Sequence, residues 1–302
     1  MYLDKSNNFF HGIMFHHFHD GKQHVKSQGS ITKEDLVKII KFIGRKNILD
    51  AEIFREKLIN NNLKENQVCF TFDDGIKSQI DIALPILEEY KIKSYFFVFT
   101  NIFEGVRNNL ELFKYFRNNL FENINEFYDL FFREFEKNFS KNLNELFEKY
   151  KNDHDNIKKI SPFYSEKDIK FRLIRDKYFK DLEYVEFMQY LFKLKNFDID
   201  DPKIIKKINF DKSDLITLNS LGHSIGLHAH THPMLLENLS YDQQREEYQN
   251  CIISISKIIQ KSENSIKSMS HPCGSYNSDT LKILENLNID IGFKNTMLKE
   301  KK

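Results

Sequence analysis

Short apolar runs alternate with amphipathic runs in the first part of the chain. Apolar and aromatic residues dominate positions 12–19, 67–72 and 93–100, and each run has the length of a buried β-strand. Two segments between these runs carry apolar residues at helical spacing: Leu36, Ile39, Ile40 and Ile43 after the capping residue Thr32, and Ile80, Ala83, Leu84 and Leu87 around Pro85. We expect helices there, the second distorted by its proline. Strands apolar on both faces that alternate with helices predict a parallel sheet covered by helices.

The pattern changes between about residues 101 and 212. Aromatic and aliphatic residues recur there at helical spacing with charges between them: Leu110, Phe113, Phe116, Leu120, Phe127, Leu130, Phe131 and Phe135. We interpret this stripe as core packing rather than as a ligand groove. Residues 101–212 are therefore predicted to form a helical insertion, with a polar interruption near residues 152–156, that caps a single α/β domain spanning residues 1–302.

Strand and helix patterns resume at Ser213. Leucines at helical spacing precede Gly222, and a short strand at 224–227 leads into a histidine-rich stretch. Ser240 and Gln243 have the spacing of a capping box, which predicts a helix through about Lys261. A strand and turn at 268–276, a helix from near Asp279 and a strand at 289–293 complete the pattern.

Composition narrows the classes of partner. Lys and Arg number 45 and Asp and Glu 44, so the net charge of +1 gives no global field toward nucleic acid or an anionic membrane. No stretch approaches the ~20 apolar residues of a membrane span, and polar residues interrupt the N-terminal segment where a secretory signal would need an apolar run. We expect a cytoplasmic protein with no nucleic-acid partner and with its three cysteines reduced.

Two polar clusters carry candidate chemistry. Asp73 and Asp74 follow the strand at 67–72, and two adjacent carboxylates resist joint ionisation unless a cation lies nearby. His228 and His232 form an H-x-x-x-H pair after another strand, and neutral imidazole suits Zn, Co, Ni or Fe. Taken alone, the first cluster also fits a solvated turn and the second a polar loop.

Together the two clusters are more specific. One aspartate and two histidines provide three metal ligands and leave a coordination position for water, which is the composition of a catalytic rather than a structural zinc site. The second aspartate is then available as a base toward that water.

These residues resemble the signatures of a known family. Thr71-Phe72-Asp73-Asp74-Gly75 is similar to the first signature of the polysaccharide deacetylases, the NodB-homology group or carbohydrate esterase family 4. The stretch from His228 to His232 resembles the second signature, with Ala229 where Ser or Thr is usual, and that from Ser270 to Tyr276 resembles the third. The resemblance covers residues 67–100 and 213–295, with a looser match at 12–19.

The resemblance implies a distorted (β/α) barrel and metal-dependent removal of the acetyl group from an N-acetyl amino sugar. It implies that Asp73 is the catalytic base toward water on the metal, and that Asp74, His228 and His232 hold a divalent metal. Zinc is the first choice of metal, with cobalt, nickel or iron as alternatives.

The third signature supplies the expected contacts with substrate. The backbone N–H of Cys273 would help to hold the oxyanion. Pro272 would shape the acetyl pocket, and Tyr276 is assigned to substrate binding.

Several positions depart from the family pattern. Ser270 replaces an arginine that orients the base in many members, and Cys273 replaces a tyrosine. The family's late catalytic histidine has no counterpart, since no histidine follows His271. His11, His16, His17 and His19 are the candidates for the missing general acid. We assign this role to His17, because the strand at 12–19 resembles the M-[YF]-H opening strand of some members and alternation places His17 opposite to His16. A surface or structurally satisfied imidazole is the alternative for His17.

The predicted function is deacetylation of a cell-surface polysaccharide or glycan precursor, whether free, nucleotide-linked or lipid-linked. The departures motivate an alternative, a catalytically inactive barrel that binds a sugar or a partner. A hydrolase of another amide or ester is a third reading. The sugar, the metal and the oligomeric state stay open.

Overall fold

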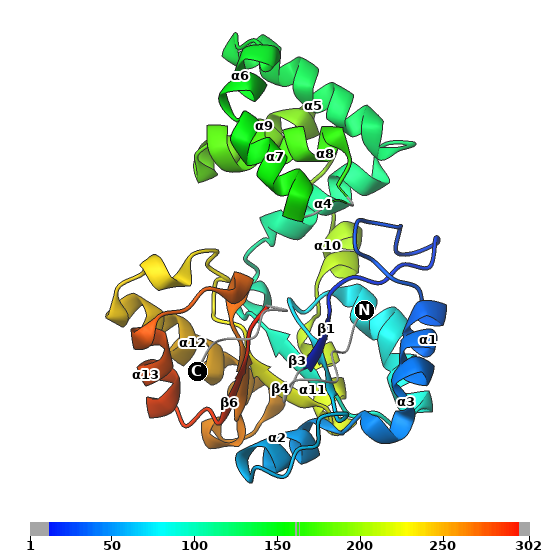
Figure 1. The fold of residues 1–302 in the computed structure, drawn as a ribbon, viewed down its shortest axis with the longest axis vertical. Coiled ribbons are helices and arrows are strands. Elements are labelled where there is room, and N and C mark those ends of the chain that lie inside the picture. The colour runs from blue at the N-terminus through cyan, green and yellow to red at the C-terminus, as the bar shows by residue number, and fades with distance from the viewer. Residues whose placement is uncertain (1–11, 161, 163, 296–302) are drawn as a thin grey trace. The chain divides into compact units, whose positions relative to one another are not determined.

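The computed structural model describes residues 12–160, 162 and 164–295 (Figure 1). Its chain divides into two compact units. Unit 1 comprises Met1–Arg107 and Ile205–Lys302, and unit 2 is Asn108–Ile204. Unit 1 carries all the motifs that the sequence singles out.

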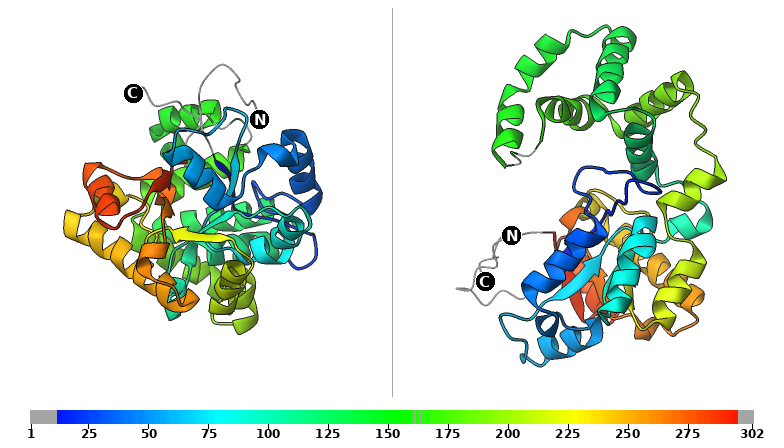
Figure 2. Two further views of the ribbon diagram at one scale, coloured as in Figure 1. Left: turned by 90° about the horizontal axis from the view of Figure 1, so that it is seen from below. Right: turned by 90° about the vertical axis from the view of Figure 1, so that its right-hand side faces the viewer.

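A six-stranded parallel sheet forms the centre of unit 1, with its strands in chain order. The strands are β1 (Gly12–Phe15), β2 (Cys69–Phe72), β3 (Tyr95–Val98), β4 (Ser224–Leu227), β5 (Ser268–Ser270) and β6 (Ile291–Phe293). The sheet curls into a half-barrel surrounded by helices (Figures 1 and 2). The predicted parallel α/β architecture, a distorted (β/α) barrel, is confirmed.

The helices of unit 1 alternate with these strands. They are α1 (Lys33–Ile43), α2 (Ala51–Ile59), α3 (Leu84–Glu89), α11 (Lys212–Ser220), α12 (Tyr241–Ile259) and α13 (Ser278–Asn286). The capping predictions are confirmed, because Thr32 and Ser240 each make a capping box at the start of α1 and α12. The expected distortion near Pro85 is a wide π-helical turn, Gln79–Ala83, directly before α3.

Alternate side chains of β2 and β3 enter two different cores. Phe72 and Phe96 stack with centroids 4.7 Å apart in the large core between the sheet and its helices. Tyr95 and Phe97 stack in a smaller core on the other face, together with Phe54 of α2. Since both faces are buried, the strands read as continuous apolar runs rather than as alternating ones.

Unit 2 contains the helices of the predicted insertion. They are α4 (Asn109–Asn119), α5 (Ile124–Phe139), α6 (Leu143–Lys149), α7 (Lys151–Ile160), α8 (Glu166–Leu173) and α9 (Asp181–Leu194), while α10 (Pro202–Ile208) spans the boundary with unit 1. Five phenylalanines in this unit are almost completely buried: Phe116, Phe127, Phe131, Phe135 and Phe171. The interpretation of the aromatic stripe as core is confirmed for its phenylalanines and Leu130, whereas Leu120 is half-buried and Leu110 is 49% exposed.

Two expected boundaries are wrong. Helix α7 runs through residues 152–156, where a polar interruption was expected, because its polar side chains form ion pairs such as that of His154 Nε2 with Glu166 at 2.8 Å. Strand β1 ends at Phe15 instead of continuing to residue 19. Beyond it, Phe18 makes only an isolated bridge to Ile31.

Within the described residues, no helix combines the length and the apolarity needed to cross a membrane.

Candidate active site

The polar motifs meet at the carboxyl ends of the parallel strands. Phe15 of β1 pairs with Phe72 of β2, so His16 and Asp73 are the next residues of two neighbouring strands. His228 follows β4 in the same way, and its N–H donates to the carbonyl of Val98 at the end of β3. In open α/β sheets the ends of several strands supply the functional groups of one site.

Asp74, His228 and His232 form a compact group. Asp74 Oδ1 lies 3.1 Å from Nε2 of His228 and 3.3 Å from Nε2 of His232, and one potential ligand atom from each residue lies within 4.8 Å of the others. Burial disfavours the Asp74 carboxylate, but its contacts with the two histidines outweigh this and hold its pKa well below the ordinary value. One carboxylate and two imidazoles are a donor set that fits a divalent transition metal.

The tautomer of His228 strengthens the fit to a cation. Nδ1 of His228 lies 2.8 Å from the carbonyl oxygen of Ser270, and a carbonyl can only accept, so Nδ1 carries the hydrogen. In the neutral ring Nε2 then presents a lone pair toward the Asp74 carboxylate. Two acceptors facing each other require a cation between them or a proton on the imidazole, and the pKa of His228 is accordingly raised by the two aspartates although burial acts to lower it.

Left-handed backbone positions shape the loops of the site. Asp74, Ala229, His232 and Cys273 have φ values of 73°, 60°, 57° and 52°. Non-glycine residues rarely adopt this region and tend to cluster at functional sites when they do. These turns allow side chains that directly follow a strand to point back across the strand ends.

The loop between the two histidines is held by Glu247 of α12. One carboxylate oxygen of Glu247 accepts from the backbone N–H groups of His230 and Thr231, both at 2.8 Å, and the other accepts from the Thr231 hydroxyl at 2.7 Å. His230 also contacts Thr100 through Nδ1, 2.8 Å from the hydroxyl. These contacts provide the anchoring that Ala229 cannot give. Glu247 was missed from the sequence, where it looks like any other charged residue of a helix.

Asp73 lies deeper than Asp74. Its side chain accepts a hydrogen bond at Oδ2 from the Ser270 hydroxyl at 2.8 Å. Its other oxygen, Oδ1, is buried and has no hydrogen-bond partner among the described residues. Burial raises the pKa of Asp73, the negative charge of Asp74 adds to the rise, and the bond from Ser270 opposes it. A carboxylate with an unused buried oxygen is a suitable proton acceptor for a group that enters the site.

A third histidine, His16, also lies next to these carboxylates. Its Nε2 lies 3.7 Å from Asp74 Oδ2, and its ring is parallel to that of His17, with centroids 6.3 Å apart. Because β1 ends at Phe15, the alternation that favoured His17 does not extend to it. Met14-Phe15-His16 itself fits the M-[YF]-H opening pattern, so His16 is the candidate among the N-terminal histidines that this geometry favours. The role assigned to His17 stays a prediction.

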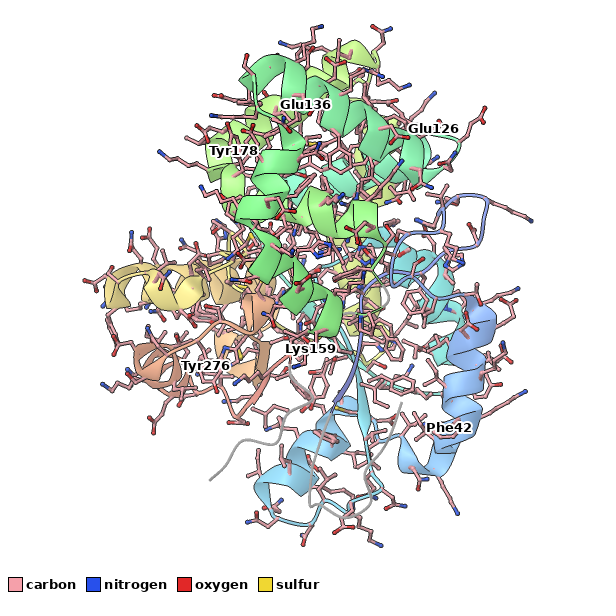
Figure 3. The ribbon with its side chains drawn as sticks, turned by 45° about the horizontal axis from the view of Figure 1, so that its top comes forward. Phe42, Glu126, Glu136, Lys159, Tyr178 and Tyr276 are labelled. Carbon is pink, nitrogen blue, oxygen red and sulfur yellow. The ribbon has the colours of Figure 1, made fainter. Side chains whose placement is uncertain are left out.

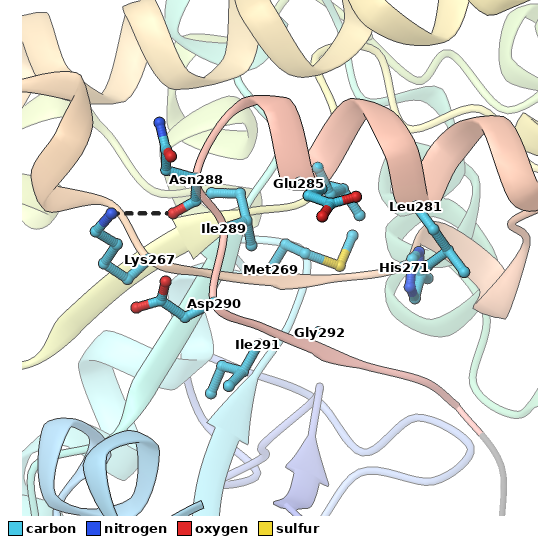
Figure 4. Close-up of a pocket in the computed structure, with 11 residues that line it drawn as sticks. Lys267, Met269, His271, Leu281, Glu285, Asn288, Ile289, Asp290, Ile291 and Gly292 are labelled. Atoms are coloured by element: carbon cyan, nitrogen blue, oxygen red, sulfur yellow. Dashed lines mark hydrogen bonds between the residues drawn. The ribbon is translucent and has the colours of Figure 1, made fainter. Parts of the chain in front are cut away.

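The residues of the third motif, Ser270 to Tyr276, lie on two sides of β5. Pro272 is buried, and the backbone N–H of Cys273 donates to no group in the part of the chain that the structure describes. Tyr276 stacks on His271 with centroids 4.5 Å apart. His271 lines a cavity of about 440 Å³ that is bounded by β5, α13 and β6 (Figure 4). His271 therefore belongs to the side of the sheet that α13 covers, and the substrate-binding role of Tyr276 stays a prediction.

Comparisons with known proteins follow the same motifs. The family model described as polysaccharide deacetylase matches residues 60–120 and 192–292, just over half of the chain. No curated protein sequence matches this chain.

Three solved structures share the fold at low sequence identity. The deacetylase PplD of Streptococcus pyogenes, in complex with acetate, has a TM-score of 0.53 at 17% identity over 95% of this chain and 83% of its own. A de-N-acetylase of Aggregatibacter actinomycetemcomitans has a TM-score of 0.53 at 12% identity, over 94% and 87% of the two chains. The BpsB deacetylase domain of Bordetella bronchiseptica has a TM-score of 0.51 at 12% identity, over 96% and 90%. With the family match, the chain belongs to the polysaccharide deacetylases, hydrolases that cleave the amide C–N bond of N-acetyl groups.

Proposed function

We propose that the protein is a metal-dependent deacetylase of N-acetyl amino sugars in a polysaccharide or glycan precursor. The observation that carries this proposal is the group of Asp74, His228 and His232 at the strand ends, with the buried Asp73 directly beside it. The chemistry that these four residues allow is hydrolytic, because they combine a cation site with an adjacent base.

Asp74, His228 and His232 would hold the metal, with zinc as the first choice and cobalt, nickel or iron as alternatives. When bound, a divalent metal of this kind polarises a carbonyl and makes water more acidic. The fit rests on the Nε2 lone pair of His228, which faces the Asp74 carboxylate. A bound cation would remove the repulsion between these two acceptors.

The protein side chains can then carry the protons of the reaction. Asp73 accepts one proton from water as the water oxygen bonds to the acetyl carbon. The free N–H of Cys273 is available to stabilise the negative charge that develops on the carbonyl oxygen. When the C–N bond breaks, the amine nitrogen takes a proton, and acetate and a free amine are the products.

We assign the donation of that last proton to His16. Its Nε2 lies 3.7 Å from Asp74 Oδ2, and His16 is not among the proposed metal ligands. His17 is the alternative. Pro272 and Tyr276 are proposed to contact the acetyl group and the sugar.

Acetate release from N-acetylglucosamine oligomers tests the function. The protein is freed of metal with a chelator and assayed with added Zn²⁺ or Co²⁺. We expect acetate to be released by the wild type with metal, and D73N and H228A to lose nearly all of this activity. No acetate from any N-acetyl amino sugar under conditions where the metal is bound would overturn the proposal and favour a binding protein. Full activity of D73N would overturn the role of the base.

A further inference from the structure

A buried glutamine links the ends of the two strands that carry Asp73 and His16. The side chain of Gln79 is completely buried. Its amide nitrogen donates to the backbone carbonyl of Asp73 at 2.7 Å and to that of His16 at 3.0 Å. Both partners are acceptors, so the orientation of the amide is fixed by its contacts.

The location of these carbonyls explains why a glutamine is needed. Past Phe15 and Phe72 the ladder between β1 and β2 ends, so the next carbonyls lose their strand partners. One primary amide has two N–H donors on a single nitrogen and can bond to one carbonyl from each of the two segments at once. A glutamate at this position has no donor, and a methionine of similar size has none either.

The buried position of Gln79 is partly unfavourable for the stability of the fold. Its own oxygen, Oε1, is buried and lacks a hydrogen-bond partner among the described residues, which destabilises the folded state. It is the first residue of the π-helical turn Gln79–Ala83, and such wide turns recur at functional sites. The neighbouring Ser78 accepts from the backbone N–H of Phe18 at 3.1 Å. This turn therefore holds the segment after β1 at two points, on both sides of His17.

We propose that Gln79 is a positioning residue that fixes His16 beside the carboxylates so that His16 can protonate the departing amine. This inference rests on the proposed deacetylase function. The amide of Gln79 donates to backbone carbonyls of the two segments, so it acts on the reaction through the placement of His16 and not by touching substrate.

The test compares two leaving groups in the variant Q79M, which keeps the size of the side chain and removes both donors. An N-acetyl amino sugar releases an amine that must be protonated, whereas 4-nitrophenyl acetate releases a phenolate that needs no proton. We expect Q79M to lower kcat on the N-acetyl sugar roughly 10- to 100-fold with KM nearly unchanged, and to change the rate on the activated ester less than about threefold. An equal loss on both substrates, or no loss on either, would overturn the inference.

A double-mutant cycle with H16N supplies a second readout. If Gln79 acts through His16, then Q79M should add little to the loss already caused by H16N. Independent, multiplying losses would show that Gln79 supports the site by another route.

The matched control is Q244M. Gln244 is also completely buried and also donates through its amide nitrogen to a backbone carbonyl, that of Leu239 at 2.9 Å, but it lies on α12. Q244M should lower the free energy of unfolding without changing the ratio of the rates on the two substrates. If Q79M does not fold, Q79N keeps two donors on a shorter stem and should show the same selectivity in weaker form. A wild type that releases acetate while Q79M and Q79N behave normally rejects only the role of Gln79, whereas a wild type without deacetylase activity rejects the proposed function itself.

Discussion

The hydroxyl of Ser270 donates to Asp73 Oδ2 at 2.8 Å, and both residues are buried. The carbonyl of the same serine accepts from Nδ1–H of His228, also at 2.8 Å. Ser270 thus joins the proposed base to a proposed metal ligand through one residue at the end of β5. Ser270 is a neutral donor, so its hydrogen bond brings no positive charge to the Asp73 carboxylate.

Removing the Ser270 hydroxyl should make the ionised form of Asp73 less favourable and so lower the rate. In S270A the ionised form of the Asp73 side chain loses the hydrogen bond accepted at Oδ2, and we expect kcat to fall roughly 10- to 100-fold with little change in KM. The pKa of Asp73 is already raised by burial, and losing this donor raises it further. The acid limb of the pH–rate profile should therefore move to higher pH in S270A. S270T, which keeps the hydroxyl, should recover most of the rate, and an unshifted acid limb in S270A would contradict the assignment.

Glu247 should control metal affinity without touching the metal. E247A removes three hydrogen bonds that shape the loop between His228 and His232, and supporting contacts of this kind typically contribute 10- to 100-fold in affinity. We expect the Zn²⁺ dissociation constant, measured by competition with a fluorescent chelator, to rise by roughly that factor. E246A changes an exposed neighbour on the same helix and should leave it unchanged.

Metal binding should stabilise the fold in a way that separates the two adjacent aspartates. A ligand at about 100 times its dissociation constant adds roughly 2.7 kcal/mol to the free energy of unfolding. Wild type and D73N should both show a rise in Tm with added Zn²⁺, because Asp73 is not among the proposed ligands. D74N and H232A should show a much smaller rise. Loss of the metal-induced shift in D73N would instead make Asp73 a ligand.

His223 should make the fold sensitive to mild acid. Its Nδ1 accepts from the N–H of Ser94 at 3.1 Å and its Nε2 lies 3.1 Å from Glu88, so the neutral ring satisfies both contacts. Burial is the main cause that lowers the pKa of His223 to about 4, despite the nearby glutamate. The unfolded chain, with an ordinary pKa near 6.5, then binds the proton more readily than the folded one.

The contribution of His223 to stability is therefore complete above pH 6.5 and is lost as the pH falls toward 4, by roughly 3 kcal/mol over that window. In H223Q, where the amide can replace both contacts, the free energy of unfolding measured in urea should depend less on pH between 7 and 4. H19Q, which removes another histidine of unit 1, should behave like wild type. Equal pH dependence in H223Q and wild type would show that His223 does not carry the effect.

Local sequence was sufficient for the parts of the molecule that depend on local signals. Continuous apolar runs that end in polar turns identify the strands before Asp73 and His228, and side-chain caps fix the starts of α1 and α12. The choice between His16 and His17 depended on the residue at which β1 ends, which pairing with β2 decides. Glu247 and Gln79 act through carbonyl and N–H groups that come from distant segments, and no pattern in their own neighbourhood marks them.

The pairing of β3 with β4 has a consequence for how the chain is assembled during synthesis. Tyr95 and Ser224 are register partners in the sheet, yet all of unit 2 lies between them in the chain. A ribosome must therefore complete unit 2 before the nascent sheet can add its fourth strand, and until then β3 presents an unpaired edge. The helices of unit 2 can begin to form while they emerge. Asp74 is synthesised before unit 2, and His228 and His232 are synthesised after it. We therefore expect the proposed metal site to be one of the last features of the protein to form.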